Sequence, residues 1–216
     1  DLVLDGVELS RVSSTGLLLE SPEGTITVSS VSSSETSSLT DYVLLNASAS
    51  GSVLFSGSSA FVPAVKAYAG NGIVVNGSVS SEGSVVLEGA WSGVSALNRT
   101  YALDVVGDDA SSHVSSVKGS VLLESSGNGR TRVRSPGTWS AGNGITVGGP
   151  VDVVGSGVFT LDSDSDLDGS GTLLLASTSN LTVASGLVSG VSVIAADVDL
   201  LSDLSAGSAS VTIQAT

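Results

Sequence analysis

Four carboxylates alternate along one short segment, and their spacing suits a metal ion. Asp162, Asp164, Asp166 and Asp168 occupy every second position, and a glycine follows them. Alternate side chains of an extended segment point to the same side, and calcium binds clustered carboxylate oxygens. Asp164, Asp166 and Asp168 match the start of a calcium-binding loop, but Leu175 stands where an EF-hand carries its last acid. The segment therefore predicts a looser calcium site, with a solvated acidic edge as the alternative.

A basic stripe is the second candidate site. Arg130, Arg132 and Arg134 alternate along one segment and make up three of the seven basic residues in a chain of net charge −14. We expect this stripe to contact acidic surface on another coil or another subunit, and so to contribute to assembly. The alternative is neutralisation within the chain by acids on adjacent coils, such as Glu88 or Glu124.

Four of the seven asparagines begin an Asn-x-Ser/Thr acceptor for N-linked glycans: Asn46, Asn76, Asn98 and Asn180. Asn76 and Asn98 are expected to be the most exposed, because each is predicted to lie where a strand meets a turn.

Catalytic chemistry has little support. His113 is the only histidine, and serine is too common for a nearby Ser and Asp to indicate a triad. The chain has eight aromatic residues, and Trp91 and Trp139 are expected to pack or cap coils rather than to bind sugar. We therefore expect no enzyme activity and no cofactor other than calcium.

A repeated glycine-led run indicates the elements that position these residues. A glycine followed by an aliphatic run recurs every 32 to 38 residues, at residues 16–20, 51–55, 83–87, 119–123 and 157–161. A loose period of this length is typical of stacked coils. It predicts an all-β parallel β-solenoid, or β-helix, with the five runs stacked in one sheet. The alternative is an antiparallel β-sandwich.

Short strands bounded by Gly, Ser, Asn or Asp are expected throughout, and helical periodicity is almost absent. The predicted strands are residues 2–4, 25–28, 42–45, 72–75, 101–106, 130–134, 145–147, 151–154, 181–183, 191–195 and 211–213. A second echo, Asn-Gly-Ile, begins at Asn71 and at Asn143. Residues 1–216 are accordingly expected to form a single elongated solenoid.

Composition excludes several partners. With 21 acidic and seven basic residues, the chain does not fit a nucleic-acid backbone or an anionic membrane surface. No apolar run approaches the length that spans a bilayer. There are no cysteines, so disulfides and thiolate metal sites are absent. The first residue is Asp1, as expected of a processed product or a piece of a longer chain.

Residues 179–186, 195–200 and 211–215 resemble filamentous-haemagglutinin-type adhesin repeats, and residues 71–90 and 142–161 resemble them more loosely. The resemblance covers about half of the chain. It implies a right-handed parallel β-helix that is displayed outside the cell and serves in adhesion or as a stalk.

These features together predict an extracellular or cell-surface structural solenoid that forms a stalk or filament and could be adhesive. The alternative function is a glycan-binding or glycan-cleaving β-helix. Predicted strands begin and end the chain with no evident cap, so we expect self-association, either head-to-tail or within a longer parent chain.

Overall fold

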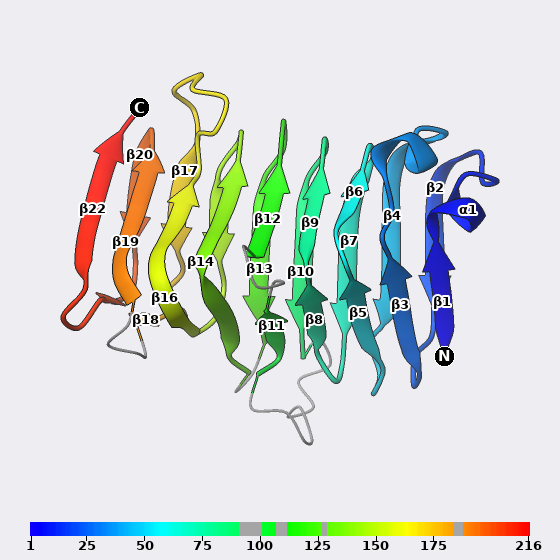
Figure 1. The fold of residues 1–216 in the computed structure, drawn as a ribbon, viewed down its shortest axis with the longest axis horizontal. Helices are drawn as coiled ribbons and strands as arrows, with labels where there is room; N and C mark the ends of the chain where they lie inside the picture. Colours follow the sequence, from blue (N-terminus) through cyan, green and yellow to red (C-terminus); the bar gives the residue numbers. More distant parts are fainter. Residues whose placement is uncertain (91–100, 107–111, 127–128, 184–187) are drawn as a thin grey trace.

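The fold is a parallel β-solenoid (Figure 1). The computed structural model describes residues 1–90, 101–106, 112–126, 129–183 and 188–216. Within these residues the strands form one 14-stranded and one eight-stranded sheet, and the strand pairs are parallel. An antiparallel sandwich is therefore excluded.

The eight-stranded sheet runs the length of the stack. Its strands in order are β2 (Ser14–Glu20), β4 (Leu39–Ala47), β7 (Ala64–Ala69), β10 (Val85–Gly89), β13 (Val121–Ser125), β15 (Ile145–Val147), β17 (Thr172–Leu175) and β20 (Asp197–Leu200).

The 14-stranded sheet consists of two tracks that share two long strands. The first track contains β1 (Leu2–Asp5), β3 (Thr25–Ser29), β5 (Ser52–Ser56), β8 (Ile73–Asn76), β11 (Leu103–Val105), β18 (Leu181–Val183) and β21 (Leu204–Ser205). The second contains β6 (Ser59–Phe61), β9 (Ser78–Ser81), β12 (Ser112–Ser116), β19 (Val188–Ala195) and β22 (Ser210–Ala215). The long strands β14 (Thr131–Ala141) and β16 (Val151–Asp162) belong to both tracks.

One turn of the solenoid visits the first track, the second track and then the eight-stranded sheet, as in β8, β9 and β10. In the first two turns, short helices take the place of the second-track strand. These are α1 (Gly6–Leu9) and the 3₁₀ helix η1 (Ser33–Thr36); α1 packs on η1, and η1 packs on β6.

The two helices were not expected from the sequence, although each begins with a local signal. The Asp5 carboxylate accepts from the Glu8 backbone N–H at 2.9 Å, and Glu8 accepts from the Asp5 N–H at 3.1 Å. Glu35 accepts from the Ser32 N–H at 2.7 Å. An Asp or Ser followed three residues later by Glu is the capping-box pattern, which satisfies backbone donors at a helix start.

The core consists of aliphatic columns that continue from turn to turn. Val65, Val85 and Val121 are in register in the eight-stranded sheet and are fully buried. In the second track, Trp139 and Phe159 are fully buried and meet edge to face, with ring centroids 4.9 Å apart. Each such side chain contributes about 1.5–3 kcal/mol by leaving water, so the stack needs no crosslink.

The five glycine-led runs do not stack in one sheet, which corrects that part of the prediction. The runs at Gly16, Gly83 and Gly119 belong to β2, β10 and β13 of the eight-stranded sheet. The runs at Gly51 and Gly157 belong to β5 and β16 of the 14-stranded sheet. The reason is variable turn length: Val65 pairs with Val85, but Val85 pairs with Val121, so the sequence period drifts relative to the turns.

The two Asn-Gly-Ile echoes form the same corner in different sheets, before β8 and before β15. Gly72 and Gly144 both have φ of +100°, and a Cβ on either would lie 2.8 Å from a backbone oxygen of the next turn, that of Ala102 or Thr172. Only glycine adopts this φ and allows this approach without strain.

Candidate functional site

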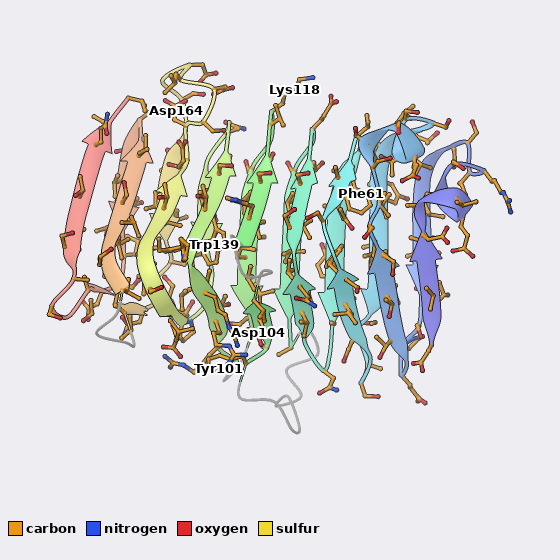
Figure 2. All side chains as sticks on the ribbon, viewed as in Figure 1. Phe61, Tyr101, Asp104, Lys118, Trp139 and Asp164 are labelled. Carbon is orange, nitrogen blue, oxygen red and sulfur yellow. The ribbon has the colours of Figure 1, made fainter. Side chains whose placement is uncertain are left out.

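The basic stripe lies in a charge ladder on the outer face of the first track. Asp104 on β11, Arg132 on β14 and Asp152 on β16 occupy directly paired positions on successive strands. Arg132 donates from Nε to Asp104 at 2.8 Å, and Arg130 donates from Nε to Asp152 at 2.7 Å. Each guanidinium also donates from Nη2 to the same carboxylate, so both pairs are bidentate. Figure 2 shows Tyr101 and Asp104 close together at one edge of the stack.

Acids of the same chain pair with two of the three arginines of the basic stripe, Arg130 and Arg132. Their hydrogen bonds to Asp152 and Asp104 raise the pKa of Arg130 and Arg132, against the opposing effect of burial. The Arg132 guanidinium also lies 4.6 Å from the centre of the Tyr101 ring, within range of a cation–π contact. The partners are Asp104 and Asp152 rather than the glutamates named from the sequence. An assembly contact through this stripe remains a prediction, and Arg134 is its most exposed member.

The acidic segment forms a loop between β16 and β17, at the opposite edge of the stack (Figure 2). Asp164 is fully buried and accepts from the backbone N–H groups of Asp168 and Gly169, each at 3.1 Å. The Thr216 hydroxyl donates to the same carboxylate. Asp164 therefore braces the loop and ties it to the residue that follows β22.

Three of the loop carboxylates converge as the sequence predicted. One oxygen from each of Asp164, Asp166 and Asp168 lies within 4.8 Å of the others, and Asp166 and Asp168 are exposed. Oxygen ligands at this separation suit calcium. The hydrogen bonds to Asp164 nevertheless account for its position without an ion, so calcium binding remains a prediction. The neighbouring Asp162 has a raised pKa because of burial, although a hydrogen bond from the Asp164 backbone lowers it.

The acceptor asparagines differ in exposure. Asn76, at the end of β8, and Asn180, just before β18, are exposed. Asn46 is half-buried, and its side-chain amide donates to Glu20 at 3.0 Å. Asn98 lies outside the described residues. Glycosylation itself remains a prediction, and the structure favours Asn76 and Asn180 over Asn46.

A carboxylate column on the outer face of the eight-stranded sheet was not identified as a site from the sequence. Tyr68, Glu88 and Glu124 occupy directly paired positions on β7, β10 and β13. Glu88 is only 7% exposed, and the Ser126 hydroxyl donates to it at 2.8 Å. The sequence does carry a signal for this pair, because both glutamates stand five residues after a Gly-Ser-Val start, at Gly83 and at Gly119.

The electrostatics of this column follow from burial and like charge. Burial raises the pKa of Glu88, and the neighbouring charge of Glu124 raises it further, while the Ser126 hydrogen bond acts in the opposite direction. Burial and the charge of Glu88 also raise the pKa of Tyr68. This acid-and-aromatic column is the arrangement that comes closest to the glycan-binding alternative.

A small pocket of about 180 Å³ opens beside this column. Its lining is polar and contains one carboxylate: Glu124, Ser125, Ser126, Gly148, Gly149, Pro150 and Thr178. All three hydroxyls of the lining donate within the chain: Ser125 to the Gly129 carbonyl, Ser126 to Glu88 and Thr178 to the Gly148 carbonyl.

The other candidate residues lie apart from these groups. Trp139 is fully buried in the core, in agreement with the expectation that it packs rather than binds sugar. Trp91 lies outside the described residues. His113 lies half-buried on β12, between Ser78 and Thr138 on the adjacent strands.

Comparisons with family models, with curated proteins and with solved structures found no match to this chain. Among the described residues, no helix is long and apolar enough to cross a membrane.

Proposed function

We propose that this chain is a structural β-solenoid of the cell surface or extracellular space, that it serves as a stalk or filament segment, and that it carries out no catalysis. Two features support the proposal. The described turns form one uninterrupted stack with an aliphatic interior. The resemblance to adhesin repeats points to the same kind of role.

The proposal rests mainly on the exposure of core-register side chains in the last turn. Its inward positions continue the core columns, because Val198 pairs with Leu173 of β17, and Val211 and Ile213 pair with Val191 and Val193 of β19. Val211 and Ile213 are nevertheless 43% and 55% exposed. Aliphatic side chains in core register are stabilised when a further turn covers them.

The backbone of this turn is also available for pairing. β20 pairs with β17, and β22 pairs with β19, so within the part of the chain that the structure describes each strand has no partner on its outer edge. Such an edge recruits another strand unless it is protected. We propose that a further turn stacks here, supplied by a second copy head-to-tail or by a longer parent chain.

Sedimentation velocity on the 216-residue chain at micromolar concentrations tests the head-to-tail form. We expect the sedimentation coefficient to rise with concentration. Ile213→Lys, which places a charge in the exposed core column, should restore a monomer. Thr212→Lys adds the same charge on the outer side of β22, where Thr212 continues the column of Ser192, and should leave association intact.

A concentration-independent monomer would overturn association between copies. Equal loss of association in Ile213→Lys and Thr212→Lys would show that charge alone, rather than the core column, controls it.

A further inference from the structure

A second partly exposed surface lies on the side of the solenoid, on the outer face of the eight-stranded sheet rather than in the exposed core columns of the last turn. On the outer face of the eight-stranded sheet, Val86, Leu122, Thr146 and Leu174 occupy directly paired positions on β10, β13, β15 and β17. All four are half-buried, whereas the alternate residues of these strands point into the core. The result is an aliphatic column, interrupted only by one threonine, that runs across four turns.

Carboxylates flank this column on one side. Glu88 and Glu124 lie two residues beyond Val86 and Leu122 on the same strands, and therefore on the same face. Glu124 also lines the small pocket and makes no hydrogen bond or ion pair with any described residue. Two carboxylates one strand apart repel each other, and a cation from a partner relieves that repulsion.

We propose that this surface binds an amphipathic helix of a partner protein, with an aliphatic stripe over Val86, Leu122 and Leu174 and with Lys or Arg residues facing Glu124, the accessible member of the carboxylate pair. Charge complementarity selects a basic partner. A second copy of this chain, with a net charge of −14, would bring like charge to the face.

The spacing of the column favours a helix over an extended segment. Neighbouring strands lie about 4.7–4.9 Å apart, and one turn of an α-helix advances about 5.4 Å. A helix along the column therefore places about one aliphatic residue over each strand for three or four turns. Same-side residues of an extended segment are about 6.6 Å apart and lose register after one strand.

The test uses two synthetic helical peptides with the same leucine stripe, one flanked by lysines and the other by glutamates. Fluorescence anisotropy at about 150 mM salt, which screens distant charges, measures their binding to the 216-residue chain. We expect only the lysine peptide to bind. Leu122→Asn should weaken binding about tenfold, and Glu124→Gln should weaken it severalfold.

Matched controls separate this face from general attraction to an acidic protein. Glu20→Gln removes the same charge at the far end of the sheet, and Leu54→Asn makes the same change on the outer face of the first track. Both should bind as the unaltered chain does, and circular dichroism checks that each variant folds. The proposal is overturned by absent binding, by equal binding of the two peptides, or by equal effects of Glu124→Gln and Glu20→Gln. A dimer that Leu122→Asn breaks in the sedimentation experiment would also overturn the proposal, because it would show that the column pairs two copies of this chain.

Discussion

The side chain of Glu88 shows how a solenoid can hold a carboxylate that costs stability when it is charged. Its raised pKa, due first to burial and then to Glu124, means that the folded state binds a proton more tightly than the unfolded state. The resulting stability is fully present below the unfolded pKa and is lost as pH rises through the folded pKa.

Glu88→Gln removes this titration while keeping the side-chain shape. We therefore expect the variant to be more stable than the parent near pH 7, with the difference shrinking as the pH falls and reaching its minimum only below about pH 4, under the ordinary pKa of glutamate. Urea unfolding midpoints across this range measure the effect, and Glu20→Gln is the control. A less stable Glu88→Gln variant at pH 7 would show that the Ser126 hydrogen bond outweighs the cost of burying the charge.

Two glycines with positive φ, Gly144 and Gly169, differ in how much space surrounds them, so alanine at the two positions should cost different amounts of stability. Gly144→Ala introduces both a left-handed φ for alanine and a clash with the Thr172 carbonyl, so it should destabilise the fold by about 1–3 kcal/mol. Gly169→Ala meets only the first penalty, because its φ is +79° and nothing lies within 4 Å of the added Cβ. Chemical unfolding should rank Gly144→Ala as the more damaging change, and the reverse ranking would contradict the close approach at this corner.

Among the elements, the loop between β16 and β17 depends on one buried carboxylate. Asp164→Ala leaves the backbone N–H groups of Asp168 and Gly169 without their acceptor, which should cost about 1–3 kcal/mol. Asp166→Ala, at an exposed position of the same loop, should change stability little. Equal losses in the two variants would contradict the bracing role of Asp164.

The same variants test the predicted calcium site. Millimolar calcium should raise the melting temperature of the unaltered chain relative to chelator, and Asp166→Ala should lose that shift. Identical melting curves in calcium and chelator would remove the site.

Strands could be predicted from the sequence, because short aliphatic runs between turn residues have few alternatives. Every predicted strand overlaps an observed one. The sheet to which each strand belongs could not be predicted, since that depends on corner lengths that vary between turns. The helix α1 was missed although Asp5 and Glu8 form its capping box. It occupies a position that only the stacking of η1 and β6 defines.

The candidate sites also differ in whether their residues are close together in the sequence. The acidic loop is local in sequence, and its three carboxylates do converge. The partners of Arg130 and Arg132 lie 22 and 28 residues away along the chain, at Asp152 and Asp104. No local pattern identifies such a pair, because only the register between turns brings the two charges together.

The exposed acceptor asparagines lie where N-linked glycans would project from the outer surface of the solenoid. From a glycosylating eukaryotic host we expect Asn76 and Asn180 to carry glycans and Asn46 to carry none, since its amide is held by Glu20. Intact mass before and after an amidase that removes N-glycans measures this. Asn76→Gln and Asn180→Gln should each remove one glycan, whereas Asn46→Gln should leave the mass difference unchanged. No loss of mass on amidase treatment would show that the acceptors are unused.

The long strands β14 and β16 should make their two turns more resistant to mechanical unfolding than the other turns of the stack. Each crosses from the first track to the second in a single strand, with a register shift near Ser135 and Gly157. In other turns, such as those of β5 and β6 or of β8 and β9, each track has a strand of its own, and in the first two turns a short helix takes the place of the second-track strand. A load on one track therefore passes to the other through a single strand in each of these two neighbouring turns, although the pairing shifts register at the crossing. Under tension, the solenoid should unfold from its ends and yield last at these two turns, which lie in its C-terminal half.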